Sequence, residues 1–269
     1  MPGDVGGPQG KRQEREKMQG LSDVLTYPLG TMGRLGNQLF QLTSTVWLGN
    51  QHGLRPRFGS RRLAAYFDLD EALFTSPLML SDATDSRTLV SADVEPEIAE
   101  YLQSAEFWGR DRDFARDLLR PKPSLASEAH AVLEGAGVEP GQFCSIHVRR
   151  GDYLDYPGKF PVAGSDYVRD ALEALQVDNE ILIFSDDPHW CSTELAPLLP
   201  DARVASAGLP ATDLIAMSLA AQLVIANSSF SWWAAYLAGH DRVACPATWF
   251  GPEVSVPGDH LQLAGWHRV

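Results

Sequence analysis

Residues 213–239 read DLIAMSLAAQLVIANSSFSWWAAYLAG, and the apolar pattern of this stretch decides the fold. A helical segment runs into the short apolar strand 223–226, and polar residues then lead into a second helix. The same order of strand, loop and helix occurs twice before it, with strands at 143–148 and 181–184. Short apolar strands that alternate with helices predict an α/β fold, whose parallel sheet is covered on both faces and binds ligands beyond the carboxyl ends of its strands.

A similar unit lies near the N-terminus. Residues from Val24 onward predict a short strand, a glycine-containing loop follows, and apolar residues at helical spacing predict a helix over 37–48. The stretch 59–119 mixes charged and apolar residues and gives only weak indications of helices, near 95–101 and 111–119.

Proline and glycine residues around 135–141 interrupt the chain and predict a domain boundary there. We therefore expect a flexible tail over 1–23, an N-terminal lobe over 24–138 and a C-terminal lobe over 139–269. The chain of 269 residues is long enough for two such lobes, and it contains no internal repeat.

The composition limits the class of partner. Asp and Glu together number 35 and Lys and Arg 22, which gives a formal net charge of -13. This balance disfavours non-specific binding to nucleic acid or to anionic lipid. A bound anion would need cationic groups that are concentrated at one place.

The sequence shows no sign of secretion or of membrane insertion. Its first 20 residues contain no apolar segment of the kind found in signal peptides. The apolar run 214–226 is shorter than the roughly 18 to 20 residues of a membrane span. The three cysteines, odd in number and far apart, predict neither a disulfide framework nor a metal knuckle. We expect a reducing compartment and no integral membrane segment.

A dense cationic cluster, HVRRGDY at 147–153, directly follows the strand 143–148. Side chains alternate along a strand, so His147 and Arg149 should share one face. An arginine at a strand end beside a glycine suits phosphate oxygens, because its guanidinium presents a rigid fork of donors. The competing interpretation is a solvated arginine pair bonded to Asp152.

Polar residues follow the other two strands as well. They are Ser185, Asp186 and Asp187 after the strand 181–184, and Asn227, Ser228 and Ser229 after the strand 223–226. Carboxylates at a strand end accept hydrogen bonds from a ribose or a base, or they cap the next helix. Hydroxyls at a helix N-terminus help to bind an anion, or they form an ordinary cap.

Two further features are compatible with ligand binding. Asp213 lies in the first turn of its helix, where a carboxylate often does no more than complement the helix dipole. Residues 33–38, GRLGNQ, form a glycine loop that enters a helix and would allow close approach of a phosphate or a sugar. Neither feature is specific by itself.

Several other chemistries lack their motifs. The Asp-x-Asp pattern that holds a divalent metal in some enzymes occurs at 68–70 and 111–113, but neither copy follows a convincing strand. The sequence contains no G-x-S-x-G elbow, no GxxxxGK[ST] loop and no GxGxxG string. Hydrolase, P-loop and ordinary Rossmann dehydrogenase functions are therefore disfavoured, and no metal site is predicted.

Four motifs, taken in order, resemble those of the alpha-1,2-fucosyltransferases, glycosyltransferase family 11. They are GRLGNQLFQ at 33–41, HVRRGDY at 147–153, FSDD at 184–187 and the stretch 213–239. The resemblance implies a GT-B type fold with two Rossmann-like lobes facing a cleft, the C-terminal lobe binding GDP-L-fucose and the N-terminal lobe serving the acceptor. It also implies a metal-independent, inverting transfer, without a cofactor, to the 2-hydroxyl of a galactose-terminated oligosaccharide or a glycolipid-linked glycan.

The resemblance carries residue roles by position. Arg149 would grip the donor β-phosphate with His147 beside it, and Asp213 would accept hydrogen bonds from the guanine edge. The donor-binding set that it implies is Arg34, Asn37, Arg149, Ser185, Asp186, Asp187, Asp213, Asn227, Ser228 and Ser229.

An inverting transfer benefits from a general base near the acceptor hydroxyl, and no motif marks one. Asp152 should brace the arginines, so Asp155 is the candidate base. The alternatives in function are transfer of another GDP sugar such as L-galactose, or a non-catalytic relative that binds a nucleotide or a glycan. Eukaryotic members carry a membrane anchor that this sequence lacks, so we expect a bacterial cytoplasmic enzyme or one at the inner membrane face. Acceptor specificity should reside in 59–119 and 154–166.

Overall fold

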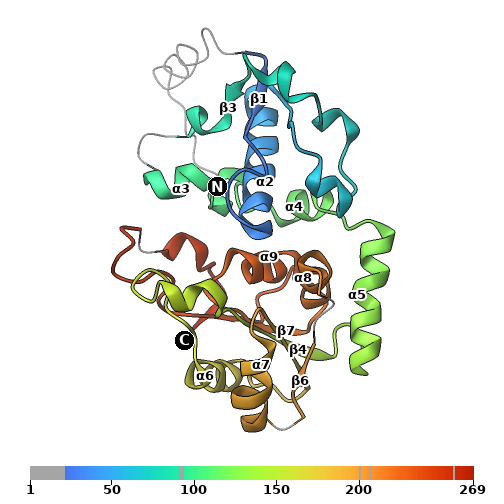
Figure 1. The fold of residues 1–269 in the computed structure, drawn as a ribbon, viewed down its shortest axis with the longest axis vertical. Helices are drawn as coiled ribbons and strands as arrows, with labels where there is room; N and C mark the ends of the chain where they lie inside the picture. The colour runs from blue at the N-terminus through green and yellow to red at the C-terminus, as the bar shows by residue number, and fades with distance from the viewer. Residues whose placement is uncertain (1–21, 91–93, 200, 206–207, 257) are drawn as a thin grey trace, which may run out of the picture.

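The computed structural model describes residues 22–90, 94–199, 201–205, 208–256 and 258–269. Residues 1–21, which make up most of the expected tail, lie outside this part. The chain builds two parallel sheets, one from each half of the sequence, and helices pack around them (Figure 1). The α/β class that the sequence predicts is confirmed.

The first sheet has the strand order β2-β1-β3, and all its pairs are parallel. The elements here are β1 (Val24–Thr26), α2 (Leu35–His52), β2 (Arg55–Pro56), β3 (Thr84–Asp85), α3 (Pro96–Tyr101) and α4 (Arg112–Leu118). Gly53 ends α2 in the left-handed conformation, with φ of 67°, which glycine adopts without a steric penalty. The predicted strand, loop and helix are all present. Short 3-10 turns connect the remaining elements.

The second sheet has the order β6-β5-β4-β7-β8-β9 and is parallel throughout. Its elements are β4 (Phe143–Val148), α6 (Ser165–Leu175), β5 (Glu180–Ser185), α7 (Pro188–Trp190), β6 (Arg203–Val204), α8 (Pro210–Ser218), β7 (Gln222–Val224), α9 (Ser229–Ala238), β8 (Val243–Cys245) and β9 (His267–Arg268). The order of the strands reverses between β4 and β7. Open parallel sheets bind ligands at such a switch point.

One long helix, α5 (Pro123–Ala136), leads from the first sheet to the second. Gly137 caps it in the left-handed conformation, and β4 begins shortly afterwards. In Figure 1, α5 runs beside α8, and the two helices pack together. The predicted boundary between residues 138 and 139 falls in the connection from α5 to β4, and the division of the chain at that point stays a prediction.

The two faces of β4 meet different helices, as the strand alternation predicts. Ile146 and Val148 pack in a cluster with α6, whereas His147 lies on the other face near Phe230 of α9. Figure 1 shows α8 and α9 on one side of this sheet and α6 on the other. The end of β4 therefore delivers His147 and Arg149 to the side that faces the first lobe.

An aromatic core joins the two lobes. The ring of Phe40 on α2 lies 4.6 Å from Trp232 and 5.0 Å from Trp233 of α9, measured between centroids. Trp108 stacks on Trp233 and donates a hydrogen bond from its indole N–H to the Tyr236 hydroxyl, at 2.9 Å. Each such aromatic pair adds roughly 0.5–1.5 kcal/mol beyond burial, so these contacts fix how the lobes face each other.

Cys144, Cys191 and Cys245 are buried and free. None of the helices in the described part of the chain has the length and apolar character needed to cross a membrane.

Candidate active site

A pocket of about 950 Å³ opens between the two lobes, beyond the carboxyl ends of β4 and β7. Most of the predicted site residues line it. They are Arg34, Asn37, His147, Arg149, Ser185, Asp186, Asp213, Asn227, Ser228 and Ser229. The fold thus gathers four separate motifs around one cavity at the topological switch point.

Arg149 is the best-fixed cation of this pocket. Its guanidinium forms an ion pair with Asp186, at 2.6 Å from Nη1 to Oδ2, and a second one with Asp152. It also lies 5.2 Å from the centre of the Tyr153 ring, and its side chain is only 14% exposed. Two carboxylates and an aromatic ring therefore hold the Arg149 guanidinium in one orientation before any ligand binds.

Arg150 and Asp187 lie outside the pocket, and their side chains stabilise the local fold. Arg150 pairs with Asp187 at 3.1 Å and lies 4.1 Å above the Trp190 ring. Asp187 caps α7 by accepting the Trp190 backbone N–H, and this bond, together with Arg150, lowers the pKa of Asp187. The predicted donor contact of Asp187 is not supported, because the helix cap uses this carboxylate.

Asp155, the candidate base from the sequence, is also misplaced for its role. It ends the 3-10 turn Gly151–Asp155, is exposed, and does not line the pocket. Asp152 and Tyr153 of the same turn do line the pocket, so proximity in sequence to Arg149 was not enough to bring Asp155 into it.

The N-terminus of α9 faces the pocket. Ser228 is its N-cap and accepts the Phe230 backbone N–H at 3.3 Å, and Ser229 follows as the first helical residue. Asn227 donates its side-chain N–H to the Trp249 carbonyl at 2.9 Å, which leaves its buried Oδ1 without a partner in the described structure. The free N–H groups and the positive dipole end of such a helix suit an anion.

His147 is buried beside this helix end. Its ring centroid lies 5.2 Å from that of Phe230, and no residue of the described structure bonds its Nδ1. Burial, with a smaller contribution from nearby Arg149, lowers the pKa of His147 to about 3. The imidazole is therefore neutral at physiological pH and offers a hydrogen bond, but no positive charge.

A second helix N-terminus meets the first from the opposite lobe. Gly36 in the first turn of α2 packs on the backbone of Ser229, so closely that no Cβ would fit there. Arg34, the N-cap of α2, pairs with Asp152 across the lobes at 3.3 Å, with its side chain 70% exposed. Asn37 lines the pocket beside them. Both helix dipoles therefore point their positive ends at this space.

Two further predicted residues lie on the wall formed by the C-terminal lobe. Asp213 lines the pocket from the first turn of α8. Ser185 ends β5, and its hydroxyl accepts the Asp187 backbone N–H at 2.9 Å. A ligand bound along this wall would run from Asp213 to the N-terminus of α9.

The wall formed by the N-terminal lobe contains residues that the motifs did not reveal. They are Arg62, Leu63, Tyr66, Ile98, Glu100, Tyr101 and Gln103. All come from the stretch 59–119, whose secondary structure was weakly indicated. His260, near the C-terminus, also lines the pocket, and burial lowers its pKa. No local signal marks these positions, because each reaches the pocket only through packing of distant elements.

The two Asp-x-Asp copies act as caps. Asp70 accepts the Ala72 backbone N–H at 2.8 Å, and Asp111 accepts that of Phe114 at 2.9 Å. In the described ranges, no group of three or more His, Cys, Asp or Glu side chains is arranged to hold a metal ion.

Comparison with known sequences gives consistent matches. The family described as glycosyl transferase family 11 matches residues 104–266. Galactoside alpha-(1,2)-fucosyltransferase 1 of Homo sapiens is 27% identical over 270 residues, which cover 90% of this chain and 73% of that protein. Galactoside alpha-(1,2)-fucosyltransferase 2 of Mus musculus is 25% identical over 255 residues, which cover 86% and 72%.

Solved structures share the architecture. A mutant of Arabidopsis thaliana FUT1 in complex with GDP superposes with a TM-score of 0.57 at 11% identity, over 89% of this chain and 74% of that one. POFUT1 in complex with GDP-fucose superposes with a TM-score of 0.51 at 12% identity, over 81% and 94%. At such low identity the likeness concerns the fold alone, and it confirms the predicted GT-B type arrangement of two lobes.

Proposed function

This chain belongs to glycosyl transferase family 11 and is therefore a glycosyltransferase, and from that premise we propose that it transfers L-fucose from GDP-β-L-fucose to the 2-hydroxyl of a galactoside, with inversion at the sugar carbon. Relatives over most of the chain are named galactoside alpha-(1,2)-fucosyltransferases, which supports both the sugar and the linkage. One observation carries the proposal: Arg149 and the N-terminus of α9 line the same interlobe pocket.

This arrangement suits departure of a nucleoside diphosphate. Negative charge grows on the β-phosphate as its bond to the sugar breaks, so fixed donors stabilise the transition state more than the bound substrate. The Arg149 guanidinium is already held in position, and the backbone N–H groups at the start of α9 present the positive end of the helix dipole. Neither group has to reorganise as the charge develops. Neutral His147 can add one hydrogen bond.

Arg34 brings a largely exposed cation from the other lobe. Its ion pair with Asp152 is largely exposed, and exposed pairs are worth only about 0–1 kcal/mol. Arg34 can therefore turn toward a phosphate at small cost. Arg34, Arg149 and two helix N-termini therefore offer hydrogen-bond donors to a diphosphate at one place, which supports the proposal that transfer is independent of metal.

Asp213 suits the base of the nucleotide. Guanine presents N1–H and N2–H side by side, and a carboxylate accepts both in bidentate fashion. Asp213 lies on the same wall as Ser185 and the N-terminus of α9, as a nucleoside diphosphate laid along this lobe requires. This placement supports GDP over UDP or ADP as the nucleotide part of the donor.

The acceptor would occupy the wall of the N-terminal lobe. Tyr66 and Tyr101 offer aromatic faces to a sugar ring, and Arg62 and Glu100 offer polar contacts to its hydroxyls. A galactose-terminated oligosaccharide or a glycolipid-linked glycan fits this description. Acceptor selection by the stretch 59–119, as the sequence predicts, agrees with the origin of these side chains.

The proposal is tested by incubating the protein with GDP-L-fucose and lactose in the presence of EDTA. Mass spectrometry should detect an added deoxyhexose, and NMR should assign an α-1,2 linkage. Faster transfer from GDP-L-galactose than from GDP-L-fucose would show that L-galactose is the donor sugar. Binding of GDP without any transfer would favour the non-catalytic alternative. Activity that EDTA abolishes and Mg²⁺ or Mn²⁺ restores would overturn metal independence.

A bacterial cytoplasmic location, free or at the inner face of the membrane, is part of the same proposal. The three free, buried cysteines support a reducing compartment. Fractionation of the source cell, followed by immunodetection in the soluble and membrane fractions, tests it.

A further inference from the structure

The structure leaves one pocket carboxylate without a role in donor binding. Asp152 and Asp186 are both ion-paired to Arg149, and Asp213 lies on the nucleotide wall. Glu100 lines the pocket from the other lobe and, among the residues that the structure describes, has no ion pair. It is exposed and comes from the last turn of α3, beside Tyr101.

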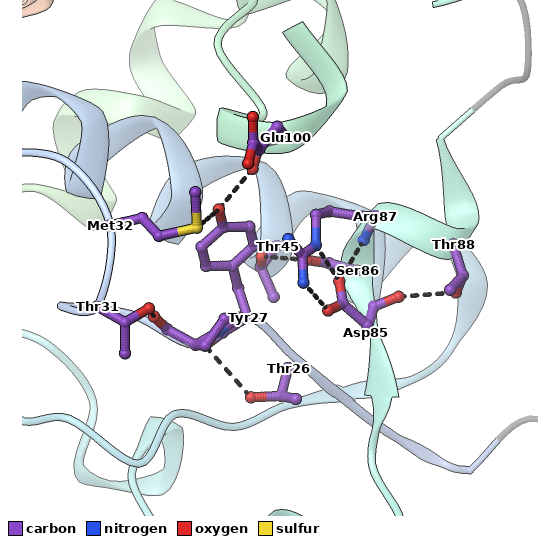
Figure 2. A network of polar contacts seen from close by, with 11 residues as sticks. Thr26, Tyr27, Thr31, Met32, Thr45, Asp85, Ser86, Arg87, Thr88 and Glu100 are labelled. Carbon is purple, nitrogen blue, oxygen red and sulfur yellow. Dashed lines mark hydrogen bonds and ion pairs between the residues drawn. The ribbon is translucent and has the colours of Figure 1, made fainter. Parts of the chain in front are cut away.

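The backbone at Glu100 is held firmly although its carboxylate is not. The hydroxyl of Tyr27 donates to the Glu100 carbonyl, and the Ser44 hydroxyl on α2 donates to the Leu102 carbonyl at 3.1 Å. Figure 2 shows the first of these bonds and the polar groups around it. Two bonds from buried side chains therefore fix the end of α3 against the core of its lobe.

The environment of Tyr27 keeps its hydroxyl protonated. It is fully buried, and burial raises its pKa to about 12, so its hydroxyl stays a donor at any physiological pH. The Arg87 guanidinium lies 5.2 Å from the centre of its ring and is bonded to Asp85 (Figure 2). The bonds of this network join the residue after β1, the loop before α2, α2 and the end of α3, so it supports the wall from which Glu100 comes.

Building on the proposed function, the geometry points to Glu100 as the general base of the transfer. The acceptor 2-hydroxyl oxygen attacks the anomeric carbon of fucose while the bond from that carbon to the β-phosphate oxygen breaks. The electron pair of the broken bond leaves with GDP, and the hydroxyl proton passes to a carboxylate oxygen of Glu100, which later releases it to water. Tyr27 is the positioning residue, because its bond to the Glu100 carbonyl fixes the backbone from which this side chain extends.

The other candidates in the structure fit this role less well. Asp155 lies outside the pocket, and Asp152 is used by two arginines. His260 lines the pocket, but its ring is bonded to the Gln103 backbone, and burial lowers its pKa. A base must also face the donor sugar from the side opposite its leaving group in an inverting transfer, and Glu100 comes from the lobe opposite the phosphate site.

The test compares Glu100→Gln with the unaltered protein, using GDP-L-fucose and lactose. We expect kcat to fall about 100-fold or more, as loss of a general base does, while the dissociation constant for GDP changes less than about twofold. Glu100→Asp should keep part of the activity. Glu95→Gln, an exposed change at the start of the same helix, is the matched control and should keep full activity.

Tyr27→Phe tests the positioning role separately, because it keeps the buried ring and removes only the anchor. The kcat should fall about fivefold with GDP affinity unchanged, in line with the loss of one hydrogen bond that holds the base in place. Turnover by Glu100→Gln within about threefold of the unaltered protein would overturn the assignment of the base and leave the proposed function standing. Absence of transfer by the unaltered protein would overturn both.

Discussion

Gly36, in the first turn of α2, lies directly against the backbone of Ser229, the first residue of α9. A Cβ atom at position 36 would lie 2.5 Å from the Ser229 carbonyl carbon and 2.6 Å from the Phe230 nitrogen. Real Cβ atoms do not approach backbone so closely. This contact joins the helix N-termini of both lobes at the pocket, and only glycine permits it.

Gly36→Ala should therefore destabilise the protein, although alanine normally favours a helix. Overpacking of a close contact costs about 1–3 kcal/mol, and the shift of α2 away from α9 should also weaken GDP binding. Gly135→Ala in α5 is the matched control, because its Cβ would meet nothing within 4 Å, and it should gain about 0.5–1 kcal/mol. Chemical denaturation and GDP titration measure both effects. An unchanged GDP affinity in Gly36→Ala would contradict the role of this contact.

Arg149→Lys should lower kcat about 100-fold or more even though the charge is kept. Lysine presents a point charge and cannot reproduce the fork that Asp152 and Asp186 now hold in place. Arg169→Lys, at an exposed ion pair on α6, is the control and should keep full activity. Steady-state kinetics with varied GDP-L-fucose give kcat for both variants. A kcat of Arg149→Lys equal to that of the unaltered protein would show that the geometry of the guanidinium does not stabilise the transition state.

Asp213→Asn should weaken GDP binding about tenfold or more, since a hydrogen bond to a charged group is worth about 1.5–3 kcal/mol. The weaker binding of UDP, whose base lacks the paired donors, should change little. Isothermal titration with both nucleotides gives the two constants. Asp166→Asn, exposed on α6, serves as the control. A parallel loss for UDP and GDP would mean that Asp213 supports the fold of the pocket and does not recognise guanine.

The buried His147 predicts how stability depends on pH. Its pKa is about 3 in the folded protein and near 6.5 when unfolded, so the unfolded chain binds the extra proton as pH falls below about 6.5. Protonation therefore favours unfolding, and this group should remove roughly 2–3 kcal/mol of stability between pH 6.5 and pH 4.5. His147→Gln should lose correspondingly less over the same interval. Denaturant unfolding at several pH values, with exposed His130→Gln as control, measures the difference.

Much of the C-terminal lobe could be predicted from the sequence, because its signals are local. Alternation along 143–148 places His147 and Arg149 on one face, and the serines after the strand 223–226 mark the start of α9. Backbone geometry enforces both patterns over a few residues. The assignment of α2 rests on the same kind of signal, with a glycine cap at its end.

Local signals failed where a role depends on what a loop packs against. Asp155 and Asp187 follow the right strands, but one turns out to solvent and the other caps α7. Glu100 carries no motif, and it reaches the pocket because Tyr27 and Ser44 hold the end of α3.

The sequence by itself therefore determined the parallel α/β lobe, its strand ends and the position of Arg149 just beyond one of them, since strand alternation and helix capping act between near neighbours. Only the tertiary structure decided which carboxylates face the pocket and how the two helix N-termini meet. Those outcomes depend on contacts between distant segments, such as Gly36 with Ser229 and Phe40 with Trp232, which no short-range pattern encodes.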